Sequence, residues 1–315
     1  MQKVNRTLLV PLGVAAWIAG FAVPYIFSAT WLFIATLFSI YALVALSQDI
    51  VLGRAGMYDM GHAVYFGIGA YTTGILSTAF AWPIVTTWPI AILAAVACAM
   101  VLAAPIVKLR GDYLLVATLG LNAIFVLALD NNLFGVTGGA DGIFGVSSPA
   151  VFGWSCDSAP RQFWLCWLAL GIGLYLMWRL ERSHLGRTLR LVKTDELAAT
   201  TLGVNARYYK VLAFGLGAGV ASLAGVLFAS VMGNVSPGSF NFAESVTLFA
   251  IVLVGGQGSV AGVLLGTVLM FVVPQAFRQL ETYRYLVFGI AMMVAMVVRP
   301  EGIWPRRGVQ GHGHE

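Results

Sequence analysis

The stretch that decides the fold runs from Ser183 to Gly225 and reads SHLGRTLRLVKTDELAATTLGVNARYYKVLAFGLGAGVASLAG. It carries dense positive charge between long apolar runs, and inside it lies a short helix with both ends marked. Thr194 is the predicted N-cap, Asp195 and Glu196 lie in the first turn, and Gly203 supplies the left-handed residue after the last turn. About eight helical residues remain, which is too few for a helix to be stable alone in water. We interpret this helix as a docking element on the cytoplasmic side of a membrane protein, with an ordinary amphipathic connector as the alternative.

The composition places the whole chain in a membrane. Of 315 residues, 59% are hydrophobic and only 10% are charged, and the mean hydropathy is +0.87. Soluble domains carry about 25% charged residues. We therefore predict an all-α, polytopic integral membrane protein with a single membrane domain over residues 1–315. The net charge of +5 is better explained by basic residues held on one side of the bilayer than by binding to nucleic acid.

Ten apolar runs are candidate transmembrane helices. They are Leu8–Phe27, Trp31–Leu52, Ala63–Phe80, Trp88–Val107, Tyr113–Leu129, Phe163–Trp178, Val211–Val231, Val246–Val254, Val260–Val273 and Tyr285–Val298. The eighth run crosses the bilayer only if it extends back through Glu244, so a re-entrant half-helix is an alternative there.

The positions of lysine and arginine predict the orientation. With ten spans and the N-terminus inside, 15 of the 18 basic residues fall on the cytoplasmic side, and only Arg161, Arg278 and Arg284 fall outside. Both termini are then cytoplasmic. The basic segment 179–210 also lies inside, and the polar, glycine-rich loop 130–161 lies outside.

Polar residues within or next to the spans are candidates for a translocation path, because ionisable groups are expensive in lipid and usually face a cavity. Asp59 and His62 lie at the break after the second span, and Asp49 lies just before it. Pairing of Asp49 and Asp59 with Arg54 at headgroup level is the alternative. In the fifth span, Asn122 and Thr118 share one face, where they either bond a neighbouring helix or line the path.

Two glycine clusters predict broken helices, one in each half of the chain. The first contains Gly53, Gly56 and Gly61, and the second contains Gly255, Gly256 and Gly258. Broken helices leave backbone groups that are tolerated only against protein or a water-filled cavity, as a translocation path requires. Close helix packing through small residues is the alternative.

Catalytic and cofactor motifs do not account for this chain. It contains no P-loop sequence, so we expect no ATPase site of its own. Tyr58-Asp59 faintly resembles half of an intramembrane aspartyl protease, but the only partner motif is Gly138-Gly139-Ala140-Asp141 in a polar loop. The three cysteines have no metal-ligand spacing, and a disulfide between Cys156 and Cys166 is a minor alternative. We expect neither a metal nor another cofactor.

Several motifs in order resemble the permeases of branched-chain amino acid ABC importers, specifically the second of the two paralogous membrane subunits. The resemblance covers residues from about Ala42 to Gly302. It is carried by Gly186–Ala199 with Leu202-Gly203-Val204-Asn205 and Tyr209-Lys210, Gly61-His62-Ala63 with Gly67–Tyr71, Gly111-Asp112-Tyr113 with Thr118-Leu119, Gly255–Ser259 with Gly262 and Gly266, and Arg299-Pro300-Glu301-Gly302.

The resemblance implies a function and a set of partners. The helix Asp195–Leu202 would be the coupling helix, received by a groove on a separate ATP-binding subunit. Its expected contact residues are Thr194, Asp195, Glu196, Leu197, Ala198, Ala199, Leu202 and Gly203. The chain would pair with a related permease subunit and two ATP-binding subunits in a bacterial inner membrane. An extracytoplasmic binding protein would deliver the substrate.

Asp59 and the breadth of the family bear on which substrate is expected. Asp59 stands where the family usually has a small hydroxyl residue, so this carboxylate would either alter substrate preference or pair with Arg54. Relatives in the same family handle urea, short amides or aromatic acids. An ion-coupled secondary transporter is a further alternative, although few ionisable residues lie within the spans.

Overall fold

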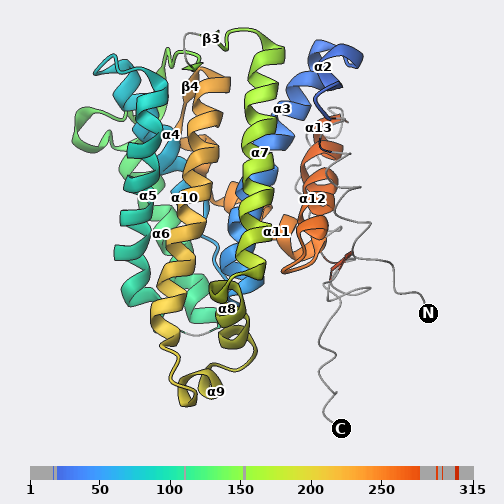
Figure 1. The fold of residues 1–315 in the computed structure, drawn as a ribbon. Coiled ribbons are helices and arrows are strands. Elements are labelled where there is room, and N and C mark those ends of the chain that lie inside the picture. Colours follow the sequence, from blue (N-terminus) through green and yellow to red (C-terminus); the bar gives the residue numbers. More distant parts are fainter. Residues whose placement is uncertain are drawn as a thin grey trace.

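The computed structural model describes residues 20–109, 111–151 and 154–276, together with residues 17, 289, 293 and 302–304. Most of them lie in helices that run side by side as one bundle (Figure 1). The main helices are α3 (Ala29–Asp49), α4 (Ala63–Thr78), α5 (Ile84–Ile106), α6 (Asp112–Asp130), α7 (Ala159–Arg182), α10 (Ala206–Met232), α11 (Phe242–Gly255) and α12 (Val260–Thr267). Shorter helices are α2 (Val23–Ile26), α8 (His184–Thr194), α9 (Glu196–Thr201) and α13 (Val273–Ala276).

Eight of the predicted spans correspond to helices or helix pairs of this bundle. Within the described part of the chain, 6 helical segments are long and apolar enough to cross a membrane. The run from Val260 is shorter, and α4 has only 16 residues. Most of the predicted span Leu8–Phe27 and all but two residues of Tyr285–Val298 lie outside the described residues, so the count of ten spans stays a prediction.

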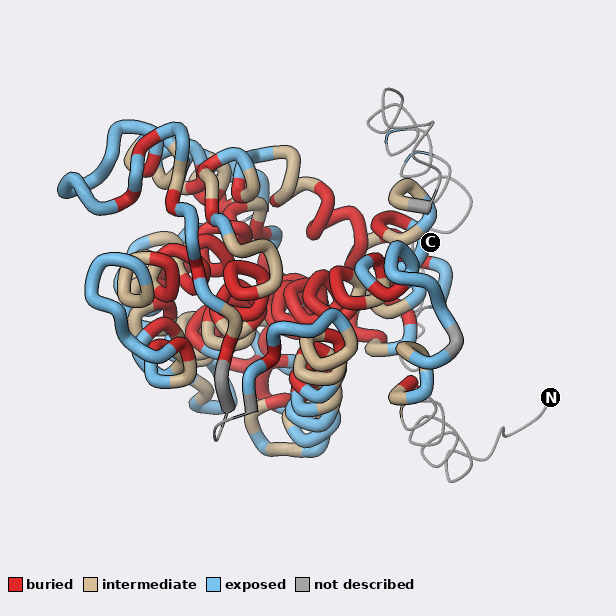
Figure 2. Tube along the Cα trace, turned by 90° about the horizontal axis from the view of Figure 1, so that it is seen from above, coloured by how far each residue is buried: buried red, intermediate tan, exposed pale blue. Residues whose placement is uncertain are grey.

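Two helices form the centre of the bundle. In α3 and α10, 67% of the apolar window is buried, compared with 22% in α5 and α6, and the view along the bundle shows the buried centre inside a ring of exposed residues (Figure 2). Small residues let the backbone of α10 meet that of the neighbouring α4. A Cβ on Gly225 of α10 would collide with the Phe66 carbonyl of α4, and one on Gly69 would collide with Ser222. Such close contact is how helices associate where lipid removes the hydrophobic driving force.

The first predicted break is present between α3 and α4. A π-helical turn, Ile50–Arg54, ends α3, and residues 55–62 are not helical before α4 begins. Gly56 lies in this stretch with φ of +72°, a backbone conformation that favours glycine.

The second predicted break separates α11 from α12. Gly255 and Gly262 pack backbone to backbone, since a Cβ on either would collide with the carbonyl of the other. α11 begins at Phe242, earlier than the predicted Val246, because Asn241 caps it by accepting a hydrogen bond from Glu244 N at 3.1 Å. At about 21 Å, α11 alone is shorter than the hydrocarbon core. Together with the turn Pro237–Phe240 the helical run reaches 19 residues.

The end of the bundle opposite α9 carries four two-residue strands (Figure 1), which are a local addition to a mostly helical fold. β1 (Ile143–Phe144) pairs antiparallel with β4 (Asn234–Val235), and β2 (Ala150–Val151) pairs with β3 (Trp154–Ser155). Loop backbone that leaves a helix still needs hydrogen-bond partners, and these strand pairs supply them.

Two smaller expectations also need correction. α5 begins at Ile84 instead of Trp88, because Pro83 precedes the first helical residue and Pro89 is accommodated inside the helix. No disulfide joins Cys156 to Cys166 in the structure.

Candidate functional site

The predicted coupling helix is present as α9, but it is shorter than expected and its cap is different. It has 6 residues, and its N-cap is Asp195, whose Oδ1 accepts hydrogen bonds from Leu197 N at 2.9 Å and Ala198 N at 3.0 Å. Thr194 is not the cap, because its hydroxyl donates to Arg190 O at 3.0 Å and closes the last turn of α8. Gly203 follows α9 with φ of +83°, as the sequence predicted.

One side of α9 is attached to the bundle. Glu196 and Lys210 of α10 form an ion pair at 2.8 Å, and buried Ala199 packs with Val192 and Ala206. The opposite side projects two apolar side chains into solvent: Leu197 is 69% exposed and Leu202 is 72% exposed. α9 lies at the end of the bundle (Figure 1) and is attached to α10, so it forms a platform on which Leu197 and the following Leu202 are exposed.

A cleft lies between this platform and the helix ends next to it. Its volume is about 230 Å³. The lining residues come from the first break, from the α5–α6 connection and from α8, α9 and α10, and they include Met57, Leu109, Lys193, Glu196 and Lys210.

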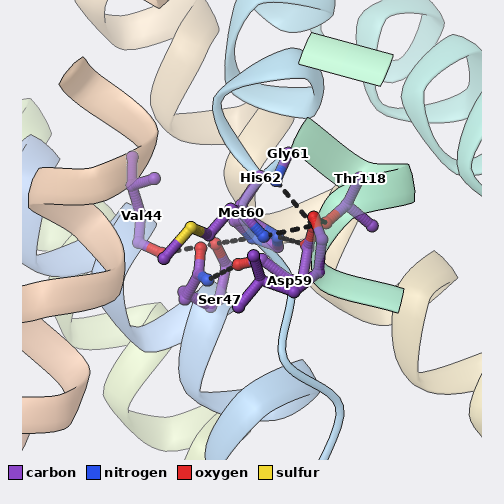
Figure 3. A network of polar contacts seen from close by, with 9 residues as sticks. Val44, Ser47, Asp59, Met60, Gly61, His62 and Thr118 are labelled. Carbon is purple, nitrogen blue, oxygen red and sulfur yellow. Dashed lines mark hydrogen bonds and ion pairs between the residues drawn. The ribbon is translucent and has the colours of Figure 1, made fainter. Parts of the chain in front are cut away.

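Around the first break, buried side chains form a connected polar network, the break network (Figure 3), which consists of Ser47, Gln48, Asp59, Met60, Gly61, His62 and Thr118. Asp59 Oδ1 accepts a hydrogen bond from Gly61 N at 2.8 Å, and its Oδ2 lies 3.1 Å from His62 Nδ1. His62 Nε2 lies 2.8 Å from Ser47 Oγ. Gln48 Nε2 donates to the Asp59 carbonyl at 2.6 Å, which fixes the non-helical segment against α3.

The two ring nitrogens of His62 connect the break network. The Ser47 hydroxyl donates to Val44 O at 2.5 Å, and Ser47 Oγ lies 2.8 Å from His62 Nε2. His62 Nδ1 lies 3.1 Å from Asp59 Oδ2, so the imidazole bridges the hydroxyl and the carboxylate. Ser47, His62 and Asp59 are connected in the order of a hydrolase triad, but Ser47 is fully buried and its hydroxyl hydrogen is committed to Val44.

Thr118 and Asn122 both bond neighbouring segments. Thr118 Oγ1 accepts a hydrogen bond from Met60 N at 3.0 Å, which connects α6 to the break network. Asn122 Nδ2 donates to the Phe240 carbonyl at 3.1 Å, and Asn122 Oδ1 is buried without a partner among the described residues. The structure therefore brings Thr118, Asp59 and His62 together, whereas Asn122 contacts a different segment.

The two breaks meet at a second cluster, which we call the junction: Asp49, Gly53, Arg54, Lys193, Gln257 and Gly258. Asp49 is fully buried. Its Oδ1 accepts a hydrogen bond from Gly258 N at 2.7 Å, and its Oδ2 lies 3.4 Å from Arg54 Nε. Gly53 lies so close to Gly258 N that a Cβ on Gly53 would approach it to 2.5 Å. The predicted pairing of Asp49 with Arg54 is confirmed, and Asp49 also joins the second break to the first.

Lys193, near the end of α8, reaches into the junction. Its Nζ donates to Gly53 O at 2.8 Å and to Gln257 Oε1 at 3.2 Å. Burial of the ammonium group lowers the pKa of Lys193, and the nearby Asp49 carboxylate opposes that shift. Gly255 and Gly256 lie beside the junction, where residues 302–304 pack on them through a hydrogen bond from Trp304 N to Gly255 O at 3.1 Å.

Asp59 does not pair with Arg54, which corrects one of the two interpretations of that residue. Asp59 is 1% exposed and is held by Gly61 and His62, whereas the adjacent Tyr58 is 42% exposed. The carboxylate of Asp59 therefore faces inward, whereas the neighbouring Tyr58 faces outward. Asp59 and His62 thus lie beneath the accessible surface.

Sequence reasoning missed Ser47, Gln48 and Lys193. Ser47 and Gln48 precede Asp49 at the end of an apolar run, and three consecutive polar residues there are a signal, because lipid penalises each of them. Lys193 carries no comparable signal, since it is one of seven basic residues between Arg179 and Lys210. In the part of the chain that the structure describes, no three His, Cys, Asp or Glu side chains are grouped to hold a metal ion.

Comparisons with known proteins agree with this architecture. Residues 30–296 match the family model described as branched-chain amino acid transport system, permease component. The chain is 36% identical to the high-affinity branched-chain amino acid transport system permease protein LivM of Escherichia coli (strain K12), over 93% of this chain and 74% of that protein.

More distant relatives share the same description. The chain is 25% identical to the probable branched-chain amino acid transport permease protein LivM of Methanocaldococcus jannaschii, over 86% of this chain and 92% of that protein. It is also 25% identical to the permease protein LivH of Salmonella typhimurium, over 87% of this chain and 94% of that protein. No solved structure matches the chain significantly. The protein is thus a multi-pass membrane protein that belongs to the family of branched-chain amino acid transport system permease components.

Proposed function

We propose that this chain is the membrane-spanning permease subunit of an ATP-driven importer for branched-chain and other hydrophobic amino acids, located in a bacterial inner membrane. Membership of the permease family supports the transport role. The similarity to LivM over nearly the whole chain supports the substrate class. The chain itself would bind neither ATP nor another cofactor.

α9 is the proposed contact with a separate ATP-binding subunit. The observation that carries this assignment is a pair of exposed leucines on an attached helix: Leu197 and the C-cap residue Leu202 are more than two thirds exposed at the end of the bundle, while Asp195 caps the helix and Glu196 attaches it to α10. Covering exposed leucines with a partner removes apolar surface from water, which stabilises the complex. The residues Thr194 to Ala199, Leu202 and Gly203 form the proposed contact segment, in which Ala199 is buried and supports the segment from the side of the bundle.

The complete importer would contain a second permease, two ATP-binding subunits and an extracytoplasmic binding protein. The chain resembles both LivM and LivH, and this double likeness supports pairing with a paralogous permease. Segment 179–210 and the loop 130–161 are proposed to face the cytoplasm and the exterior, respectively.

The proposed role of the polar clusters is to shape the translocation path and to allow it to move. Asp59, His62 and Thr118 fix the first break from inside, and Gly255, Gly256 and Gly258 form the second break. Asn122, with a buried oxygen that lacks a partner among the described residues, is the proposed polar contact nearer the outer end of α6. None of these roles requires Asp59 to touch the substrate.

Reconstitution tests this function. The chain would be incorporated into liposomes with its paralogous permease and ATP-binding subunits, with ATP on the side of α9 and binding protein on the other side. We expect accumulation of radiolabelled leucine that requires ATP and both subunit types and persists when a protonophore is added. Uptake by the permeases alone, abolished by the protonophore, would instead support an ion-coupled transporter that uses the buried Asp59–His62 pair. ATP-dependent uptake of urea, a short amide or an aromatic acid in preference to leucine would correct the substrate class.

A further inference from the structure

The most informative unassigned feature is the way Lys193 connects the platform to both breaks. Two residues separate Lys193 from Glu196, the first residue of α9. The same ammonium group donates to Gly53 O in the first break and to Gln257 Oε1 in the second break. Gly53 is 140 residues and Gln257 is 64 residues away from Lys193 along the chain, and both are bonded by the same Nζ atom.

The two breaks are also joined to each other at this point, independently of Lys193. Asp49 at the end of α3 accepts a hydrogen bond from Gly258 N. The absence of side chains on Gly53 and Gly258 allows the two backbones to touch, since a Cβ on Gly258 would lie 3.3 Å from Gly53 O. A displacement of one break is therefore transmitted to the other by direct contact.

The junction is charged and buried, which makes it sensitive to the position of Lys193. Asp49 is fully buried and its nearest cation is Arg54, with Lys193 contributing a second positive charge. A buried carboxylate that loses part of its compensating charge is strongly destabilised. Arg54 Nη2 is buried without a hydrogen-bond partner among the described residues, so the junction holds a donor that this conformation does not use.

Space beside Lys193 allows α8 to move relative to the junction. The cleft of about 230 Å³ borders Lys193, Gly56 and Met57 on one side and Glu196 and Lys210 on the other. The platform is held to α10 by the Glu196–Lys210 pair, so α9 and the start of α10 would move together. The lysine then follows them, because it belongs to the helix that leads into α9.

We propose that Lys193 is a positioning residue for transport: it transmits movement of α8 and α9 to both breaks at once through Gly53 O and Gln257 Oε1. This inference rests on the proposed function, since it assigns the connection between the ATP-driven platform and the path. When α8 shifts, both hydrogen bonds of Lys193 are lost together, and Asp49 retains only Arg54 and Gly258. The two breaks then rearrange in the same step.

The test measures leucine transported per ATP hydrolysed in the reconstituted importer. Lys193→Met removes the charge and both hydrogen bonds but retains an unbranched stem. Lys193→Arg retains the charge and donors. Lys108→Met, which removes an exposed lysine at the same end of the bundle, is the matched control. Hydrogen bonds to charged groups typically alter an equilibrium by tenfold or more. We expect Lys193→Met to reduce the ratio roughly tenfold while it still co-purifies with the ATP-binding subunits and hydrolyses ATP.

The other variants separate coupling from folding. We expect Lys193→Arg to recover most of the ratio, Lys108→Met to match the unmodified protein, and Gln257→Leu to reduce the ratio less than Lys193→Met. The double variant Lys193→Met with Gln257→Leu should be no worse than Lys193→Met alone, because both remove one interaction. An unchanged ratio in Lys193→Met would overturn the inference. If Lys193→Met is not inserted, a ratio in Gln257→Leu equal to that of the unmodified protein would overturn the inference, because this variant removes one of the two acceptors of Lys193.

The outcome is distinguishable from a failure of the proposed function. If the unmodified protein shows no ATP-dependent leucine uptake, the proposed function is wrong and the ratio has no value to compare. If the unmodified protein transports leucine and Lys193→Met transports it with the same ratio, only the role of Lys193 is wrong.

Discussion

Truncation of the two exposed leucines of α9 should weaken binding to the ATP-binding subunit by a predictable amount. Burying a leucine side chain completely contributes about 1.5–3 kcal/mol. Leu197 is 69% exposed and Leu202 is 72% exposed. Full coverage by a partner would then be worth about 1–2 kcal/mol for each residue, or about 2–4 kcal/mol together. The double variant Leu197→Ala with Leu202→Ala should therefore bind about 30- to 700-fold more weakly, at 1.4 kcal/mol per tenfold change.

The assay is titration of the ATP-binding subunit onto the permease pair in detergent or nanodiscs, read out as an apparent Kd. The matched control is Leu168→Ala with Leu176→Ala, which truncates two leucines of α7 that are 47% and 46% exposed on the side of the bundle. We expect the control to bind normally. An apparent Kd within a factor of three of the unmodified protein for the α9 variant would refute the reasoning that these leucines are covered on docking.

Three further predictions follow from backbone contacts and from buried polar groups. Gly255→Ala would place a Cβ against the Gly262 carbonyl, so we expect it to lower the Tm in detergent. Gly120→Ala is the control, because its added carbon meets nothing within 4 Å. Equal Tm values for the two variants would contradict the close packing of α11 on α12. Asp59→Asn should lower stability by about 1–3 kcal/mol because it disturbs the buried contact with His62. It should also leave the ratio of leucine to phenylalanine uptake unchanged, and an altered ratio would show that Asp59 reaches the substrate. Gly203→Ala, at φ of +83°, should weaken the end of α9 by about 1 kcal/mol and reduce ATPase binding, whereas normal binding would indicate that this turn does not position α9.

Much of the fold follows from patterns that act over short distances along the chain. Apolar runs predicted the spans, most of them about 20 residues long, and in the described part these runs correspond to helices. Gly203 predicted the end of α9 because only glycine adopts that backbone conformation easily. The N-cap was misplaced by one residue because Thr194 and Asp195 both satisfy the same preference, and only the three-dimensional structure shows that Thr194 closes the preceding helix.

The candidate site was less predictable, because its contacts join residues far apart in sequence. The two glycine clusters were identified as breaks, but nothing in the sequence indicates that Asp49 would reach Gly258 across 209 positions. The direction of Asp59 was equally undetermined, since non-helical backbone has no fixed period to place a side chain inside or outside. Its separation from Arg54 and its contact with His62 are consequences of how residues 55–62 fold against α3 and α6.

α10 gives the molecule one uninterrupted rod from face to face. With 27 residues it is about 40 Å long. It starts three residues after Gly203, and it ends at Gly233, whose carbonyl accepts hydrogen bonds from Gly145 and Val146 at 3.1 Å. A tilt of about 10° around its midpoint would swing each tip by about 3.5 Å in opposite directions. Such a tilt would move α9 and the strand pair β1–β4 in opposite directions, because they are attached to opposite ends of the same helix.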